Sequence, residues 1–139
     1  GFIIHGRSDA VLNPGGVRIG TAELYRAVEA VPEVLESLAV GERADGDERI
    51  VLFVVLRDGL VLDAGLCGKI RLAVRQTLTP RHVPAKILQV TDLPRTRSGK
   101  LAELAVRAIL HGEPVPNLAA LSNPEALAQI HRSFETGRH

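Results

Sequence analysis

The sequence predicts an α+β domain, in which an N-terminal β-hairpin precedes a compact three-stranded sheet that is packed by helices. Three observations support this fold class. Short apolar segments with strand character alternate with segments of helical periodicity in the order ββ-α-ββ-α-β-α. The segment 50–56 is apolar on both faces, as in the central strand of a sheet. Turn-forming residues separate the paired apolar runs: Asn13-Pro14-Gly15-Gly16 early in the chain and Asp45-Gly46 later.

The N-terminal half is expected to contain the hairpin, one helix and a pair of strands. The hairpin covers residues 9–20 and the helix covers 21–31, where Thr21 suits the N-cap and Pro32 ends the helical pattern. The inward-facing residues of this helix are Leu24, Val28 and Val31. Residues 37–56 read as two strands joined by the second turn.

The C-terminal half is expected to contain two further helices around a third main strand. A helix begins at Asp63 and closes before Pro80, and its apolar side consists of Leu66, Ile70, Ala73, Val74 and Leu78. Residues 84–90 form the strand, and the last helix places Leu101, Leu104, Ala105, Ala108 and Ile109 on one face. We therefore expect a domain over residues 1–112 and a C-terminal tail over 113–139, with a short helix after Asn123-Pro124.

Composition excludes several classes of function. Aromatic residues make up 3% of the 139 residues and the formal net charge is +1, so neither a stacking platform nor a basic surface for nucleic acid is expected. No apolar run is long enough to span a membrane, and no signal peptide is visible. The single Cys67 cannot form an internal disulfide, which suits a cytoplasmic protein, and no zinc-ligand spacing occurs. The chain contains no Met, so we expect it to be a piece of a longer protein.

Two polar clusters are not explained by packing. In "GRSDAVLNPGGVRIGTAE", residues 6–23, the glycines allow a ligand to approach closely and the arginines suit phosphate. "LPRTRSGK", residues 93–100, is a polar loop that ends in Lys100 at a helix start. Each cluster also has an ordinary interpretation, as a solvated Gly-rich hairpin and as a helix start capped by Ser98. Neither has the spacing of a dinucleotide fingerprint, a Walker loop or a serine elbow, so the residues alone name no reaction.

Together and in this order, the two clusters resemble signatures of the C-terminal domain of the acyl-adenylating enzymes, which include acyl-CoA synthetases, peptide-synthetase adenylation domains and luciferases. The predicted order of elements fits this resemblance, which covers residues 1–112. Within the family, "NPGGVRIGTAELYR", "TRSGKLAELAVRAILHGEPV" and "ALSNPEAL" are most similar to the acetoacetyl-CoA synthetases. Acetyl-CoA synthetases more often have an acidic residue where Tyr25 stands, and arginines where Glu103 and Leu104 stand.

The resemblance implies a reaction in two steps. ATP and a carboxylate, here acetoacetate, form an acyl-adenylate and release pyrophosphate; the thiol of CoA then displaces AMP to give acetoacetyl-CoA. Lys100 matches the catalytic lysine, which bridges the carboxylate and the α-phosphate as charge develops. Ser98 and Gly99 match the residues that position its loop.

The first cluster matches residues that act in the second step and in domain rotation. Asp9 matches the hinge residue, although on spacing alone it is equally a turn residue. Arg7 and Arg18 match nucleotide-binding positions, and Gly16 matches a glycine that lines the tunnel for the pantetheine arm of CoA. Arg75 matches a position near the CoA 3′-phosphate, and its ordinary interpretation is a surface arginine of a helix.

The resemblance also implies a large N-terminal domain, which holds most of the contacts to ATP, CoA and Mg²⁺ and selects the acyl group. We expect this chain alone to be an inactive lid, whose partners are that domain, its small-molecule substrates, and lysine acetyltransferases and deacetylases that act on Lys100. Two alternatives stay open. The chain could be the lid of an acetyl-, propionyl- or butyryl-CoA synthetase, or a stand-alone module that binds a partner protein through its hairpin.

Overall fold

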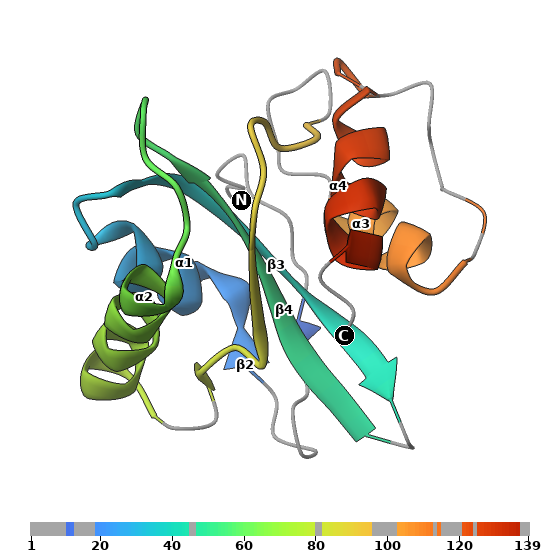
Figure 1. Cartoon of the computed structure of the whole chain (residues 1–139). Helices are drawn as coiled ribbons and strands as arrows, with labels where there is room; N and C mark the ends of the chain where they lie inside the picture. The colour runs from blue at the N-terminus through green and yellow to red at the C-terminus, as the bar shows by residue number, and fades with distance from the viewer. Residues whose placement is uncertain are drawn as a thin grey trace, which may run out of the picture.

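A three-stranded mixed sheet lies between two pairs of helices (Figure 1). The computed structural model describes residues 11–12, 19–44, 47–79, 82–95, 103–112, 114, 121–123 and 125–136. The elements run in the order β1 (Val11–Leu12), β2 (Ile19–Gly20), α1 (Thr21–Glu29), β3 (Val34–Ala44), β4 (Asp47–Leu56), α2 (Ala64–Thr77), β5 (Lys86–Gln89), α3 (Glu103–Leu110) and α4 (Glu125–Thr136). This order confirms the predicted α+β class, including the separate N-terminal pair of strands.

The main sheet has the strand order β3-β4-β5, so β4 is central as predicted and β3 is an edge strand. β3 pairs antiparallel with β4, with Leu38 opposite Phe53, and β5 pairs parallel to β4, with Lys86 opposite Val51. The smaller sheet joins β1 and β2 in antiparallel pairing. The two predicted turns, Asn13–Gly16 and Asp45-Gly46, lie outside the described residues.

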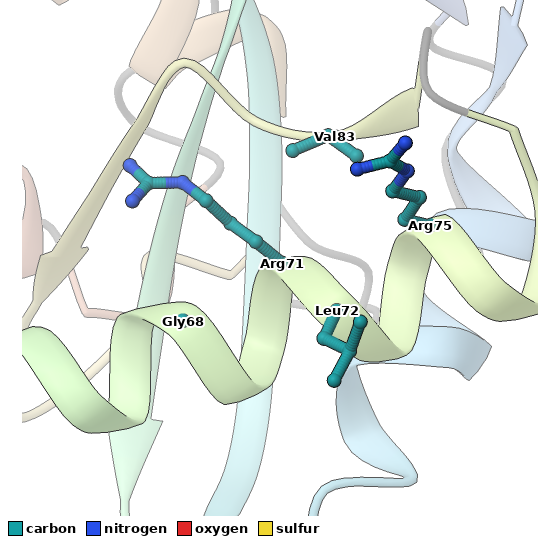
Figure 2. A pocket seen from close by; sticks show the side chains of 5 residues that line it. All are labelled: Gly68, Arg71, Leu72, Arg75 and Val83. Atoms are coloured by element: carbon teal, nitrogen blue, oxygen red, sulfur yellow. The ribbon is translucent and has the colours of Figure 1, made fainter.

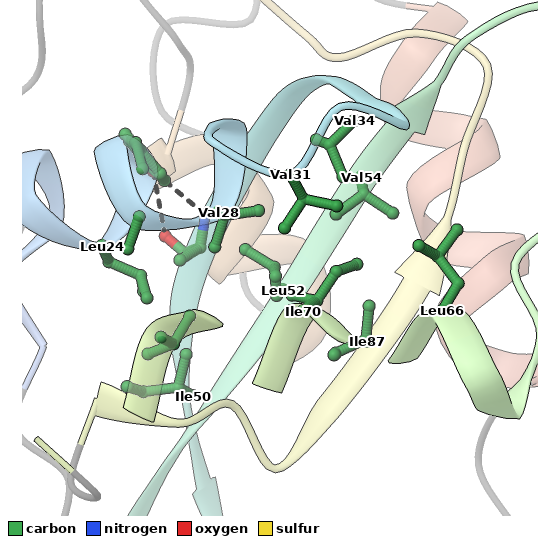
Figure 3. Packing of buried hydrophobic residues seen from close by; sticks show 14 of the residues in the cluster. Leu24, Val28, Val31, Val34, Ile50, Leu52, Val54, Leu66, Ile70 and Ile87 are labelled. Atoms are coloured by element: carbon green, nitrogen blue, oxygen red, sulfur yellow. Dashed lines mark hydrogen bonds between the residues drawn. The ribbon is translucent and has the colours of Figure 1, made fainter. Parts of the chain in front are cut away.

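Alternate residues of β4 supply the two halves of the core. Ile50, Leu52, Val54 and Leu56 pack with α1 and α2, where Leu24, Val28, Ile70 and Val74 are fully buried (Figure 3). Val51 and Phe53 pack on the opposite face with α3 and α4, where Val106 and Ile130 are fully buried. The predicted inward faces of the first two helices are therefore confirmed.

The helix starts follow their local sequence in one case and depart from it in another. Asp63 caps α2 as predicted, because its Oδ1 accepts a hydrogen bond from the backbone N–H of Leu66 at 2.7 Å. The expectation that Thr21 caps α1 is wrong. Gly20, which is extended and makes no side-chain bond, occupies the N-cap, and Thr21 is a buried residue of the first turn. The helix follows β2 directly, so the strand end itself supplies the extended cap residue.

The helix expected after Asn123-Pro124 is present as α4. Leu121, Leu127 and Phe134 lie in the same core cluster as β3 and α3, so the segment from 121 onward covers the second face of the sheet. The boundary at residue 112 stays a prediction. In the described part of the chain, no helix has the length and hydrophobicity that a membrane span requires.

Candidate functional site

Most of the predicted site residues lie outside the described part of the chain: Arg7, Asp9, Gly16, Arg18, Ser98, Gly99 and Lys100. Their roles remain predictions. Residues 96–102, which contain Lys100 and the end of the predicted polar loop, are called the Lys100 loop below. The structure describes the chain on both sides of them, up to Arg95 and again from Glu103. It also describes Arg75 and the groove beside it.

The upstream end of the Lys100 loop is held by the side chain of Asn123. Its Oδ1 accepts a hydrogen bond from the backbone N–H of Arg95 at 2.8 Å, and its Nδ2 donates to the carbonyl of Leu93 at 2.8 Å. The same Nδ2 donates to Asp92 Oδ2 at 2.9 Å. The backbone N–H of Ser122 also donates to the carbonyl of Arg95 at 2.9 Å. The segment before α4 therefore fixes the path by which the chain enters the loop.

Arg95 adds a second attachment at this end of the loop. Its guanidinium forms an ion pair with Glu36 on β3. Both side chains are more than a third exposed, so solvent weakens this pair and the Asn123 contacts contribute more. The loop thus begins at a point that is tied to the sheet and to the segment before α4.

The downstream end of the loop leads into α3, whose first turn contains a buried carboxyl group. Glu103 is 2% exposed, and its Oε2 accepts a short hydrogen bond from the Tyr25 hydroxyl of α1. The Tyr25 hydroxyl in turn accepts a bond from the backbone N–H of Ala39 at 3.0 Å. Burial, and then the negative charge of Glu103, raise the pKa of Tyr25 far above its ordinary value, so the hydroxyl stays protonated and donates.

Arg75 lies beside an open groove of about 440 Å³ along α2. The groove is lined by Gly68, Arg71, Leu72, Arg75 and Val83. Figure 2 shows Arg71 and Arg75 one helical turn apart, on the side of α2 that faces Val83. Arg71 makes long contacts of 3.4 Å to the carbonyls of Pro84 and Ala85, whereas no acidic side chain of the described residues pairs with Arg75. An exposed, unneutralised guanidinium at a groove is suited to bind a phosphate.

The remaining chemical groups of the described residues indicate no second reactive centre. Burial raises the pKa of the Cys67 thiol, which disfavours the nucleophilic thiolate. The hydrogen bond from Lys69 lowers the pKa of Glu33, and this pair ties α2 to the chain before β3. Within the described ranges, no group of His, Cys, Asp and Glu side chains is arranged to hold a metal ion.

Sequence reasoning missed the attachments of the loop, although some signals were present. Tyr25 stands on the inward side of a helix in a chain with a single tyrosine, and a buried tyrosine hydroxyl normally requires a polar partner. Glu103 lies next to the apolar face of a predicted helix, but an acidic residue is common in the first turn of a helix and so did not indicate a buried contact. Asn123 was interpreted only as part of a helix start, and no sequence pattern shows that it reaches back across 28 residues to Arg95.

Comparisons with known proteins place this geometry in a family. The AMP-binding enzyme C-terminal domain matches residues 23–100. The acetoacetyl-coenzyme A synthetase of Rhizobium meliloti (strain 1021) is 58% identical over 127 residues, which cover 91% of this chain and 20% of the relative. The acetoacetyl-CoA synthetase of Xenopus tropicalis is 46% identical over 128 residues, covering 91% of this chain and 19% of the relative. Among solved structures, the acetoacetyl-CoA synthetase from Streptomyces lividans matches with a TM-score of 0.80 and 37% identity, over 96% of this chain and 20% of that one.

The chain spans about a fifth of the length of these relatives. The family match includes more than half of the chain, extends from α1 through the main sheet, and ends at Lys100, the residue that the sequence singled out. This chain therefore belongs to the AMP-binding enzyme C-terminal domain family.

Proposed function

We propose that this chain is the C-terminal domain of an AMP-forming acetoacetyl-CoA synthetase, which converts acetoacetate, ATP and CoA to acetoacetyl-CoA, AMP and pyrophosphate. The strongest support is the 58% identity to the Rhizobium meliloti acetoacetyl-coenzyme A synthetase over 91% of this chain. The likeness in fold to the Streptomyces lividans enzyme supports the same assignment.

In the first step, a carboxylate oxygen of acetoacetate attacks the α-phosphorus of ATP, and pyrophosphate leaves. Both reacting groups are anions, so they approach only where a cation offsets their repulsion. Lys100 supplies this cation: an ammonium group on a long side chain reaches the carboxylate and the α-phosphate together as charge develops. Ser98 and Gly99 shape the loop that carries it, and the contacts of Asn123 and Glu103 hold the two ends of that loop.

In the second step, the CoA sulfur attacks the acyl carbon and AMP leaves. We assign the hairpin to this step: Asp9 is the hinge, Arg7 and Arg18 contact the nucleotide, and Gly16 leaves room for the pantetheine arm. Arg75 binds the 3′-phosphate of CoA, an assignment supported by its exposed position at the α2 groove.

The rest of the protein supplies what this domain does not carry. We assign Mg²⁺, together with the ATP phosphates, to the N-terminal part of the protein, as the resemblance implies. Acyl specificity belongs to that part as well. We further propose that lysine acetyltransferases and deacetylases regulate the protein at Lys100, where acetylation removes the bridging charge and stops adenylation. Full adenylation activity in protein that is completely acetylated at Lys100 would contradict this regulation.

ATP–pyrophosphate exchange by the full-length protein tests the proposal. We expect the fastest exchange with acetoacetate, compared with acetate, propionate and butyrate offered separately. Lys100→Ala should lower kcat/KM by about 10²–10³-fold, the typical effect of losing one preorganised contact to the developing charge. The matched control is Lys69→Ala, which removes an exposed lysine that pairs with Glu33 at 3.0 Å and should leave exchange unchanged.

Each other outcome overturns a separate part of the proposal. Faster exchange with acetate, propionate or butyrate would retain the reaction and reject acetoacetate. Exchange that is equally fast in Lys100→Ala and wild type would reject the catalytic lysine. No exchange with any acid would favour the stand-alone binding module.

A further inference from the structure

Tyr25 and Glu103 come from helices on opposite faces of the sheet and meet at its open edge. α1 packs on one face, α3 packs on the other, and β3 is the edge strand between them (Figure 1). The Tyr25 hydroxyl contacts the backbone of Ala39 on β3, where the N–H donates to it at 3.0 Å and the carbonyl lies 3.4 Å away. Its short bond to Glu103 continues this connection to α3. The side chain of Tyr25 thus links both helical layers across β3.

Each group in this connection has a defined role as donor or acceptor. The Ala39 N–H donates to the Tyr25 oxygen, and the tyrosine donates its single proton to the carboxylate of Glu103. The order of donors and acceptors does not reverse, because burial and the adjacent carboxylate keep the phenol protonated. The connection therefore fixes the direction in which the Tyr25 hydroxyl points, as well as its contact with Glu103.

Stability alone does not explain a carboxylate at this position. Glu103 is 2% exposed, Tyr25 is 7% exposed, and the neighbouring Ala105 and Val106 of α3 are buried apolar residues. Replacing buried polar pairs by apolar residues of similar size is often neutral or stabilising, whereas a hydrogen-bonded pair specifies one geometry. What the bond between Tyr25 and Glu103 adds is one defined contact to the first turn of α3.

Glu103 lies three residues after Lys100, so the chain between them spans at most about 11 Å. The position of the first turn of α3 therefore limits where Lys100 can lie. We propose that Tyr25 and Glu103 are positioning residues, which fix this turn against β3 and thereby aim Lys100 at the reacting groups during adenylation. This inference rests on the proposed function of Lys100 and adds two residues that do not touch substrate.

The structure brings Tyr25 and Glu103 into direct contact, although 78 residues separate them in the sequence.

Measuring the two half-reactions separately in the full-length protein tests the inference. Adenylation is followed by ATP–pyrophosphate exchange, and thioester formation by adding CoA to synthetic acetoacetyl-adenylate. We expect Tyr25→Phe, which removes only the hydroxyl, to lower kcat for adenylation about ten- to a hundredfold. The KM values for ATP and acetoacetate should change by less than about twofold, because neither residue touches substrate. The rate of thioester formation should change by less than about twofold as well, because we assign the Lys100 loop to the first step only.

The matched control is Ser37→Ala. The Ser37 hydroxyl donates to Glu29 Oε2 at 2.9 Å and also ties α1 to β3, and this bond does not involve α3. This variant loses a partly buried hydroxyl–carboxylate bond between α1 and β3, and it should retain both half-reactions. Glu103→Gln keeps an oxygen that accepts the tyrosine bond, so its adenylation rate should exceed that of Glu103→Ala by at least about tenfold. Circular dichroism establishes that each variant is folded.

Three results would overturn the inference. Wild-type adenylation by Tyr25→Phe would show that the hydroxyl positions nothing, and equal losses in both half-reactions would indicate general destabilisation. Equal rates for Glu103→Gln and Glu103→Ala would exclude the hydrogen bond as the cause. Lys100→Ala measured in parallel separates this inference from the proposed function. If that variant adenylates as fast as wild type, both fail; if it is slow while Tyr25→Phe is fast, only the positioning role fails.

Discussion

At the scale of single residues, Tyr25 makes the most informative polar contacts of the described structure. Its hydroxyl bonds the backbone of an edge strand and the only glutamate of α3, and it is nearly inaccessible to solvent. A buried phenol beside a carboxylate resists ionisation, because the phenolate would be desolvated and repelled. The folded state therefore binds this proton more tightly than the unfolded state does.

The stability of the chain should decrease at high pH for this reason. The folded pKa of Tyr25 is raised above its unfolded value of about 10, so its stabilisation is complete below about pH 10 and is lost as pH rises toward the folded pKa. We expect the free energy of unfolding to fall by up to about 1.4 kcal/mol per pH unit above pH 10, and Tyr25→Phe to lack this slope.

The absorbance of the phenolate reports the ionisation of Tyr25 directly, because the chain has one tyrosine and no tryptophan. Ionisation should accompany unfolding and should not occur in the folded protein near pH 10. A folded protein whose tyrosine titrates at its ordinary pKa would show that the buried contact with Glu103 does not form.

Sequence reasoning was reliable for buried apolar residues and incomplete for buried polar ones. The inward positions of the first helix followed from spacing, since Leu24 and Val28 recur at helical intervals and are fully buried. The partners of Tyr25 did not follow, because hydrogen bonds over 78 residues depend on how the helices pack. Periodicity predicts which side of a helix is buried, but not which polar group lies opposite.

At the scale of elements, the segment before α4 acts as a clamp on the chain that enters the Lys100 loop. The side chain of Asn123 accepts a hydrogen bond from the backbone N–H of Arg95 and donates one to the backbone carbonyl of Leu93. Leu93 is fully buried, so the loss of these contacts would leave polar backbone groups with poor access to water.

Asn123→Ala should therefore destabilise the chain by about 2 kcal/mol, the cost of leaving buried backbone groups unsatisfied. Urea unfolding measures this as a lower midpoint with an unchanged slope. Ser122→Ala is the matched control, because the exposed Ser122 hydroxyl lies 3.3 Å from the Arg95 carbonyl and its loss should cost less than about 0.5 kcal/mol. Equal effects in the two variants would show that the asparagine is not a clamp.

The sequence predicted the elements that local signals define. The Asp63 cap, the central strand over 50–56 and the helix after Asn123-Pro124 all have such signals, and all are present. The cap of α1 was mispredicted because Thr21 has a favourable residue type but lies one position inside the helix, where it is buried, and Gly20 takes the cap position. The clamp was not predicted, since it depends on tertiary packing of α4.

At the scale of the whole molecule, helices cover both faces of the sheet, and the described chain on either side of the predicted Lys100 loop is attached to this framework. The order of elements implied the α+β class, whereas the distribution of helices over the two faces emerged only from the structure. The catalytic assignment came from motif resemblance, because a lysine after Ser-Gly has no chemical meaning without a substrate beside it. The family match shows the type of domain, and the role of Lys100 stays a prediction.

A domain exchange tests the central claim most directly. This chain replaces the corresponding C-terminal segment of the Rhizobium meliloti acetoacetyl-coenzyme A synthetase, which is 58% identical to it, and acetoacetate-dependent ATP–pyrophosphate exchange is measured. Since we propose that the large domain selects the acyl group, we predict an active chimera whose activity Lys100→Ala lowers by about 10²–10³-fold. A folded chimera that exchanges no faster than the large domain alone, or that is indifferent to Lys100→Ala, would contradict it.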